Sequence, residues 1–321
     1  MKALCFMEFG QKEVLRYMDV PHPVMKEDEV LIRTKAIGLN YADIYRRKGH
    51  YHLEGEPPYI LGYEGAGVVE AVGKQVQGIK IGDSIAFADV PYANAELVAV
   101  PFHKAIPISD NIAFTDAAAV LLQGLTAQYL VADSFPVQQG DTVVIHSAAG
   151  GVGQLLVQLA KIKGAKVIAI VSSALKAEAA KKAGADHTLT YADNWTASVQ
   201  ELTDTKGADA VYDAVGATLM QSFEAVKVGG TVVFYGMAGG NPPLIDPRML
   251  MDTSKTLTGG DLWNVLTTRE NRITRAGELF QLMAEGKLLL PSITTFPLSE
   301  GQAAHGLLES RKNIGKIILL P

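Results

Sequence analysis

The feature that most constrains the fold lies between residues 141 and 163, where a buried strand runs into a glycine-rich turn and then a helix. Residues 142–145 are a β-branched run typical of a strand, and the small residues 147–151 allow close approach to the backbone. Because the backbone amides at the N-terminus of the following helix would face an anion bound over the turn, the segment predicts a pyrophosphate site. The strict dinucleotide fingerprint has glycine at 148, 150 and 153, and Ala148 replaces the first. Taken alone, the segment also fits an ordinary strand-to-helix turn.

Strands and helices alternate through the middle of the chain. We expect strands at 142–146, 166–171, 187–191, 208–213 and 230–236, with helices near 153–163, 174–183, 195–203 and 217–226. Such alternation requires right-handed crossovers, so it predicts a doubly wound parallel sheet.

The two ends of the chain have a different pattern. Residues 1–100 are dense in short strand patterns such as 30–36 and 67–73, which predict a β-rich domain. After Pro247 the pattern is mixed, with a helix expected at 277–286 and a closing strand at 315–320. Since 321 residues exceed the usual size of a single core, we expect two domains, with the C-terminal segment returning to the first.

Charge, hydropathy and cysteine content exclude several classes of protein. The net charge is -5 and no basic block is present, so the sequence offers no footprint for a nucleic-acid backbone. No apolar run has membrane-spanning length and residues 1–10 lack a signal-peptide core, so we expect a cytoplasmic protein that does not contact the membrane. Cys5 is the only cysteine, which excludes a disulfide framework and a cysteine-rich zinc site.

The end of the second expected strand in the alternating region indicates which nucleotide binds. An acidic residue at this place binds the ribose of NAD, but here Ser172 and Ser173 follow the strand, with Lys176 one helical turn later. Two hydroxyls and an ammonium suit a 2′-phosphate, so the pattern favours NADPH. An N-cap serine followed by a solvated lysine explains the same residues equally well. Tyr191, after the next strand, either covers the adenosine phosphate or packs at the sheet edge.

The order of several segments resembles the medium-chain dehydrogenase/reductase superfamily, and within it the zinc-free quinone oxidoreductases similar to zeta-crystallin. The segments that carry the resemblance are 38–45, 62–67, 123–127, 148–153, 210–216 and 315–316. The resemblance covers nearly the whole chain. It implies an α/β protein in which residues 1–122 and 257–321 form a chaperonin-10-like β-rich catalytic domain and residues 123–256 form a Rossmann domain, with the cofactor cleft between them. It also implies that Ser172, Ser173, Lys176 and Tyr191 receive the 2′-phosphate of NADPH.

The resemblance also bears on metal. Zinc-dependent relatives have cysteine at the position of Asn40 and histidine at that of Tyr63, so both ligands are absent here. His50 and His52 are the one close pair of histidines, and they fit a solvated loop better than a metal site. We therefore expect no metal, and a substrate that accepts hydride without a Lewis acid.

Quinones and conjugated enones meet that demand, because the added charge is delocalised. Asn40 resembles the asparagine beside nicotinamide and substrate, where its amide donates to a carbonyl oxygen. Tyr45 and Tyr51 match tyrosines that line a quinone pocket, Asp43 is expected to orient neighbouring amides, and the basic run 46–48 reads as a solvated face. The cofactor contacts that the resemblance implies are completed by Asn40, Gln123, Thr126, Ala149, Gly150, Gly151, Val152, Tyr235 and Gly236.

Three functions follow in order of preference. The first is an NADPH:quinone reductase that passes hydride, or single electrons, to a small-molecule quinone. The second is a zinc-free enoyl or alkenal reductase, in which a tyrosine at the position of Tyr51 donates a proton. The third is a non-enzymatic, NADPH-regulated RNA-binding or structural protein, against which the glycine turn and the pocket tyrosines weigh. Residues 255–259 resemble the family's edge strand that pairs across a homodimer.

Overall fold

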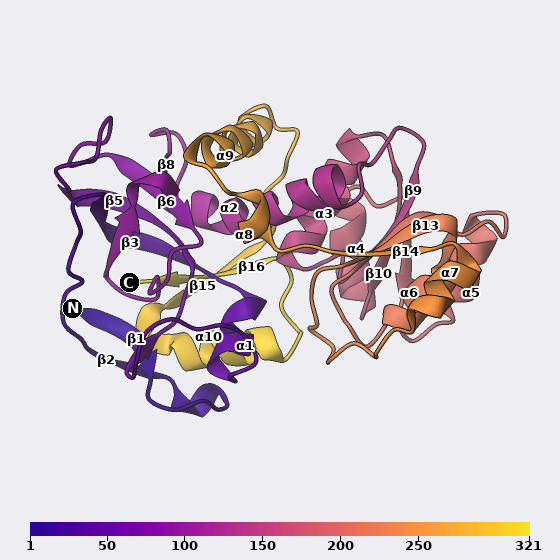
Figure 1. Cartoon of the computed structure of the whole chain (residues 1–321), viewed down its shortest axis with the longest axis horizontal. Helices are drawn as coiled ribbons and strands as arrows, with labels where there is room; N and C mark the ends of the chain where they lie inside the picture. Colours follow the sequence, from indigo (N-terminus) through magenta and orange to yellow (C-terminus); the bar gives the residue numbers. More distant parts are fainter. The chain divides into compact units, whose positions relative to one another are not determined.

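The structure is a computed structural model that describes all residues from Met1 to Pro321, and it divides into two compact units (Figure 1). Unit 1 comprises Met1–Leu122, Leu266–Gln281 and Ser292–Pro321, and unit 2 comprises Gln123–Val265 and Leu282–Pro291. Each unit has its own sheets and its own apolar core.

Unit 2 contains a six-stranded parallel sheet in the order β11-β10-β9-β12-β13-β14. Its strands are β9 (Thr142–His146), β10 (Lys166–Val171), β11 (His187–Thr190), β12 (Ala208–Asp213), β13 (Val226–Phe234) and β14 (Thr256–Gly259). The doubly wound sheet expected from the sequence is therefore confirmed. β13 begins four residues earlier than expected because Val226 already pairs with Ala208.

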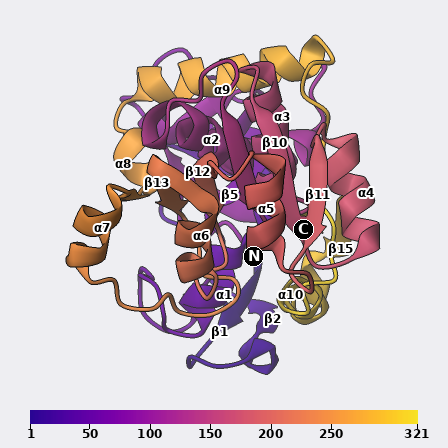
Figure 2. The same cartoon turned by 90° about the vertical axis from the view of Figure 1, so that its right-hand side faces the viewer.

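Helices connect the parallel strands. They are α3 (Gly151–Ile162), α4 (Ala174–Lys182), α5 (Trp195–Leu202), α6 (Leu219–Ala225), α7 (Pro247–Thr253) and α8 (Leu262–Val265), with a π-helical turn at Leu130–Ser134. α3 packs with α4, and α5 packs with α6 (Figure 2). β9 and β10 pair in parallel, so their carboxyl ends lie side by side, and after β11 the chain crosses back to place β12 on the other side of β9.

Unit 1 is built from two sheets. The seven-stranded sheet has the order β15-β16-β3-β5-β6-β8, with β7 also pairing β3, and the three-stranded sheet has the order β2-β1-β4. The strands are β1 (Lys2–Phe6), β2 (Arg16–Asp19), β3 (Glu29–Leu39), β4 (Tyr59–Ile60), β5 (Glu64–Val72), β6 (Ser84–Ala88), β7 (Leu97–Pro101), β8 (Ala105–Pro107), β15 (Ile293–Pro297) and β16 (Lys316–Leu320). The β-rich character expected of the first 100 residues is confirmed.

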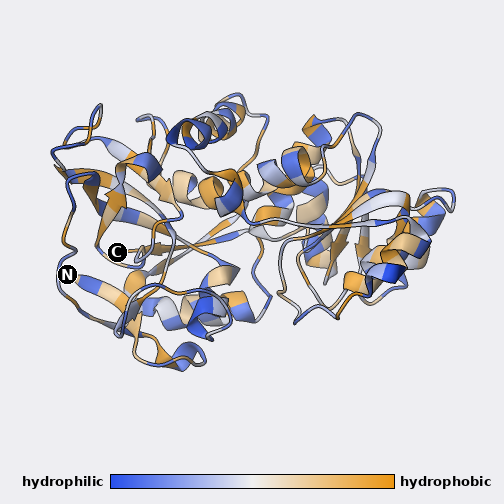
Figure 3. Ribbon diagram, in the orientation of Figure 1, coloured by the Kyte–Doolittle hydropathy of each residue, from blue (hydrophilic) through white to orange (hydrophobic).

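Few helices complete unit 1. They are α1 (Tyr41–Arg47), α10 (Gly301–Glu309) and the 3-10 turns Lys12–Val14, Phe102–Lys104 and Leu298–Glu300. Two longer helices, α2 (Phe114–Tyr129) and α9 (Arg269–Ala284), supply residues to both units. Apolar residues concentrate in the strands (Figure 3). No helix has both the length and the apolar character needed to cross a membrane.

The C-terminal part of the chain differs most from its sequence-based description. Residues 282–291 group with unit 2, and so do residues 257–265, whereas the family resemblance implied that everything after residue 256 lies in the β-rich domain. Residues 257–265 do so because β14 pairs with β13 and extends the parallel sheet. α9 also begins at Arg269, eight residues before the helix expected at 277–286. The prediction missed this start because the first turns of α9 are polar and lack the apolar periodicity that indicates a helix.

Candidate functional site

Three neighbouring strands of the seven-stranded sheet in unit 1 bring polar side chains together at the same end of the strands. β3 lies between β16 and β5, with Leu39 opposite Ile317 and Ile37 opposite Gly65. Asn40 follows β3, Lys316 begins β16 and Glu64 begins β5. The antiparallel register therefore places these three residues at the same end of their strands.

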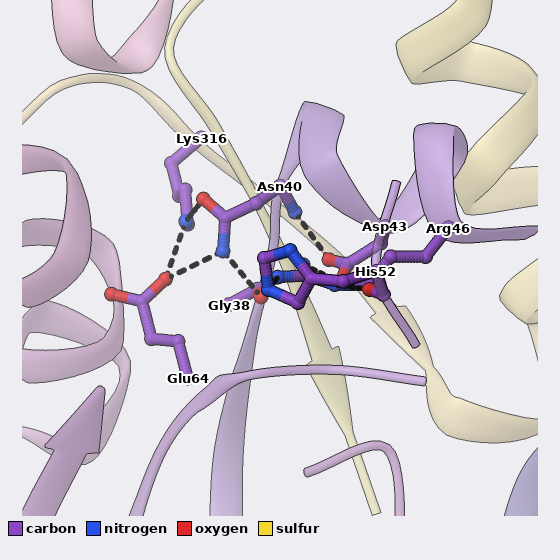
Figure 4. A network of polar contacts seen from close by, with 7 residues as sticks. All are labelled: Gly38, Asn40, Asp43, Arg46, His52, Glu64 and Lys316. Atoms are coloured by element: carbon purple, nitrogen blue, oxygen red, sulfur yellow. Dashed lines mark hydrogen bonds and ion pairs between the residues drawn. The ribbon is translucent and has the colours of Figure 1, made fainter. Parts of the chain in front are cut away.

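Asn40, Glu64 and Lys316 form a buried network (Figure 4). The Lys316 ammonium donates to Asn40 Oδ1 at 2.9 Å and to Glu64 Oε2 at 2.7 Å. Asn40 Nδ2 donates to Glu64 Oε2 at 3.0 Å and to the carbonyl oxygen of Gly38 at 3.1 Å. The side chains of Lys316 and Glu64 are both 0% exposed, so each charge depends on the other.

This network determines how the Asn40 amide is oriented. An ammonium only donates, so the oxygen of the amide must face Lys316 and its nitrogen must face Glu64. Both hydrogens of Nδ2 then have acceptors in unit 1, Glu64 and Gly38. The sequence predicted Asn40 as a donor to a substrate carbonyl, and that role requires one of these two bonds to be released.

Glu64 and Lys316 are functional candidates that the sequence reasoning did not single out. Each lay inside a segment that carried the family resemblance, and a charged residue at the start of an apolar strand was the signal available. Glu64 Oε1 also accepts from the amide of Leu122 at 2.7 Å. A Cβ atom at Gly38 would lie 2.1 Å from Glu64 Oε2, so the close approach of this carboxylate requires glycine there.

The N-terminus of α1 is tied to the same region. The Asp43 carboxylate accepts from the backbone N–H of Asn40 at 2.9 Å, as in a capping box, which is the orienting role expected for Asp43. Its other oxygen lies 3.7 Å from Arg46 Nη1. Burial raises the pKa of Asp43, against the opposing effects of Arg46 and the Asn40 amide.

The basic run 46–48 is not the solvated face that the sequence indicated. Arg46 is 2% exposed and Arg47 is fully buried. Arg47 donates to Glu309 at 2.8 Å and lies 3.1 Å from His305 Nδ1, and both of these residues are on α10. The prediction was wrong because the partners of Arg47 are more than 250 residues away in the chain.

The tyrosines predicted for the substrate pocket lie on and after α1. The ring of Tyr45 packs against Tyr41, with centroids 5.7 Å apart. Tyr51 packs against His52 at 4.1 Å, and the guanidinium carbon of Arg46 lies 4.9 Å from the Tyr51 ring centroid. Both predicted tyrosines are partly exposed, which is compatible with contact to a ligand.

In unit 2 the glycine turn has the features of an anion site. α3 begins at Gly151, with Gly150 as its N-cap, so the amides of residues 151–153 have no acceptor within the helix. A Cβ atom at Gly153 would lie 2.3 Å from the carbonyl oxygen of Ser147, so helix and turn pack too closely for any side chain there. At Gly150 a Cβ atom would lie 3.2 Å from the carbonyl oxygen of Ser147, which is tighter than an ordinary contact, so a side chain there would also crowd the turn.

The departure at Ala148 has a local explanation. The left-handed residue of this turn is Ser147, with φ 52°, and not residue 148. Glycine is therefore not required at 148, and the buried Ala148 fits.

The side chains of Tyr191, His146, Ser222 and Asp213 form a chain of hydrogen bonds that ends at the backbone amide of Ser147. The Ser147 amide and the Tyr191 hydroxyl are 3.1 Å apart, and this hydroxyl lies 3.1 Å from His146 Nδ1. His146 Nε2 lies 3.2 Å from Ser222 Oγ, which donates to Asp213 at 2.7 Å. Burial lowers the pKa of His146 to about 4, so the ring is neutral, with Nδ1 accepting from Tyr191 and Nε2 donating to Ser222.

The residues predicted to bind a 2′-phosphate lie at the carboxyl edge of the same sheet. Ser172 follows β10, whose Ile170 pairs with His146 of β9. Ser173 is the N-cap of α4, and its Oγ accepts from the Lys176 amide at 3.4 Å. This is the capping role that the sequence held as an alternative, and the Ser173 hydroxyl still has its own hydrogen to donate.

The remaining predicted cofactor contacts lie in unit 2. Gln123 packs on the start of α3, because a Cβ atom at Gly151 would overlap its side-chain amide. Thr126 is one helical turn along α2 from Gln123. Tyr235 and Gly236 follow β13, and the Tyr235 amide donates to the carbonyl oxygen of Asp213 at 3.0 Å. Burial raises the pKa of Tyr235. Ala149 and Val152 complete the turn.

The donor set in unit 1 does not suit zinc. No group of three or more histidine, cysteine, aspartate or glutamate side chains is placed to hold a metal ion. The amide of Asn40 and the phenol of Tyr63 are poor zinc ligands, and Glu64 is neutralised by Lys316.

Comparisons with known proteins agree with this arrangement. Residues 26–134 match the family described as "Alcohol dehydrogenase GroES-like domain", and residues 151–276 match "Zinc-binding dehydrogenase". The quinone oxidoreductase of Pseudomonas aeruginosa is 39% identical over 100% of this chain and 99% of the relative.

Two further relatives bear on substrate and cofactor. The crystal structure of Escherichia coli quinone oxidoreductase complexed with NADPH has a TM-score of 0.96 and 34% identity, covering 100% of both chains. A 2-haloacrylate reductase of Burkholderia sp. is 37% identical over 91% of each chain.

Proposed function

The chain belongs to the quinone oxidoreductases of the medium-chain dehydrogenase/reductase family, and on that premise we propose that it reduces a quinone with NADPH. The observation that carries the proposal is the buried network of Asn40, Glu64 and Lys316 in place of a zinc-binding donor set. A conjugated acceptor delocalises the charge that hydride addition develops and needs no Lewis acid, whereas a simple carbonyl must be polarised by a metal ion or an acid.

The residues of unit 2 have the chemistry to hold NADPH. The amides of Gly151 and Val152 at the start of α3 bind the pyrophosphate, and Ala149 and Gly150 keep large side chains out of the turn. The hydroxyls of Ser172 and Ser173 and the ammonium of Lys176 bind the 2′-phosphate. Tyr191 supports the turn that carries these amides. Gln123, Thr126, Tyr235 and Gly236 hold the nicotinamide half.

When bound, NADPH supplies the hydride, and unit 1 orients the acceptor. Asn40 holds the substrate oxygen through its amide, releasing Gly38 or Glu64 as it does so. The rings of Tyr45 and Tyr51 pack on the flat face of the quinone. Product oxygens take their protons from solvent, so no side chain is required as an acid.

A second candidate function is reduction of a conjugated carbon–carbon double bond. It is favoured by the relative named as a 2-haloacrylate reductase, because an acrylate is a conjugated alkene. In this reaction a carbon atom must be protonated, and Tyr51 is the residue that donates the proton.

The experiment that tests both is a turnover assay with NADPH and a panel of quinones, 2-alkenals and enoyl thioesters. Rapid NADPH oxidation with quinones supports the first function, and preference for alkenals supports the second. An RNA-binding titration runs beside it. RNA binding without turnover of any acceptor would refute both enzymatic functions and favour the non-enzymatic alternative.

The protein is further proposed to act as a cytoplasmic homodimer. β14 is an edge strand of the six-stranded sheet, because within the chain it pairs with β13 alone. An edge strand with unpaired amides and carbonyls is suited to pairing with its copy across a two-fold axis.

A further inference from the structure

We infer that Arg46 is a positioning residue that holds Tyr51 in place for the substrate. The inference rests on the proposed function in one respect, that Tyr51 contacts the acceptor. Arg46 belongs to the basic run that the sequence assigned to solvent, yet it is 2% exposed. Arginine is rarely buried unless other residues satisfy its charge and its hydrogen-bond donors, so the burial of Arg46 must have a structural reason.

The contacts of Arg46 converge on the segment that carries Tyr51. Its guanidinium carbon lies 3.6 Å from the ring centroid of Tyr63 and 4.9 Å from that of Tyr51. Its Nε donates to the carbonyl oxygen of His52 at 3.1 Å, and its Nη2 lies 3.4 Å from His52 Nε2. Because the His52 ring packs on Tyr51, Arg46 contacts Tyr51 both directly and through its neighbour.

Residues 51–58 depend on such contacts because they form no helix and no strand. A segment without ladder hydrogen bonds is held by its side chains, and it opens locally when they are lost. Arginine suits this position since its planar guanidinium stacks between two aromatic rings while its edge still donates hydrogen bonds. Lysine keeps the charge but has neither the plane nor the fork of donors.

The other end of the same contact chain reaches the substrate asparagine (Figure 4). Arg46 Nη1 lies 3.7 Å from Asp43, whose second oxygen accepts from the backbone N–H of Asn40 at 2.9 Å. One guanidinium thus contacts both the Tyr51 segment and Asp43, which binds the backbone of the N-cap residue Asn40. A shift of the Tyr51 ring would weaken its packing on the acceptor, and lost binding of this kind raises KM with little effect on kcat.

Arg47 provides a matched control. It follows Arg46 on α1 and is fully buried, but its donors face Glu309, His305 and the carbonyl oxygen of Gly10. Replacing Arg47 by lysine therefore disturbs an equally buried site on the same helix without touching the Tyr51 segment.

The test compares Arg46→Lys with Arg47→Lys in steady-state kinetics with 1,4-benzoquinone. We expect Arg46→Lys to raise KM for the quinone about tenfold while kcat changes by less than about threefold and NADPH affinity is unchanged. Arg47→Lys should leave KM unchanged. In a Tyr51→Ala background, Arg46→Lys should have no further effect on KM, because its influence passes through Tyr51.

A second readout does not depend on activity. Cleavage by a glutamate-specific protease after the exposed Glu54 should be about tenfold faster in Arg46→Lys and unchanged in Arg47→Lys. If the protein turns over no quinone, the proposed function fails while this measurement still tests the positioning role. If Arg46→Lys does not fold, Tyr63→Leu removes the ring beneath the guanidinium and should produce the same changes more weakly.

Three outcomes would overturn the inference. The first is an increase in KM from Arg46→Lys that is as large in the Tyr51→Ala background as in the unmodified protein. The second is an increase in KM from Arg47→Lys as large as that from Arg46→Lys. The third is an unchanged rate of cleavage after Glu54 in both Arg46→Lys and Tyr63→Leu.

Discussion

Replacing Lys316 by methionine should destabilise the protein strongly, because it leaves the Glu64 carboxylate buried without its counter-charge. Both side chains are 0% exposed and the two charged atoms are 2.7 Å apart. Breaking such a pair from one side costs about 3–5 kcal/mol of unfolding free energy, whereas removing both charges costs much less. The Asn40 amide also loses the donor that orients its oxygen.

The assay is urea unfolding followed by circular dichroism, with the variants Lys316→Met, Glu64→Gln and the double variant. The double variant should be more stable than Lys316→Met by about 2 kcal/mol or more, since glutamine carries no charge and still accepts from the Leu122 amide. Lys2→Met, which breaks the exposed pair with Asp19, serves as the control and should change nothing measurable. A loss below about 1 kcal/mol in Lys316→Met, or strictly additive effects, would refute the reasoning.

Four further predictions address cofactor, chemistry, pH and assembly. Lys176→Ala should weaken NADPH binding by about ten- to a hundredfold and leave NADH binding nearly unchanged, measured by fluorescence titration, and equal affinities of the unmodified protein for both nucleotides would contradict the 2′-phosphate site. Tyr51→Phe should retain most turnover with 1,4-benzoquinone, whereas a loss of about 10²–10⁴-fold with a 2-alkenal would identify Tyr51 as a proton donor and favour the second function. Burial, assisted by the Arg47 charge, lowers the pKa of His305 from 6.5 to about 3, so below pH 6.5 the unfolded chain takes up a proton that the folded chain does not. The free energy of unfolding should therefore decrease as the pH is lowered from 6.5 towards 3, by up to about 1.4 kcal/mol per pH unit. Urea titrations at several pH values measure this dependence, and His305→Gln should flatten it. Light scattering at micromolar concentration should give twice the mass of the chain, and a monomeric mass would contradict pairing through β14.

The sequence determined most of the alternating strands and helices between residues 142 and 236 of unit 2, whereas α7, α8 and the π-helical turn were not predicted. Strands β9, β10 and β12 begin and end where the pattern predicts, since a buried parallel strand is a short apolar run and each is bounded by turn residues. The glycine turn before α3 was also legible, because its requirement for small residues is local. The family resemblance indicated that Asn40 and Tyr63 replace zinc ligands, and the single cysteine excluded a cysteine-rich zinc site.

Tertiary structure alone decided which charged residues are buried and what they do. Glu64 and Lys316 are separated by 252 residues and meet only because β16 and β5 flank β3. Arg46 and Arg47 look like a solvated run, and their burial depends on aromatic rings after α1 and on α10. Local periodicity specifies which face of an element is apolar, but the partner of a buried charge is set by strand order and helix docking, which bring together residues that no local pattern connects.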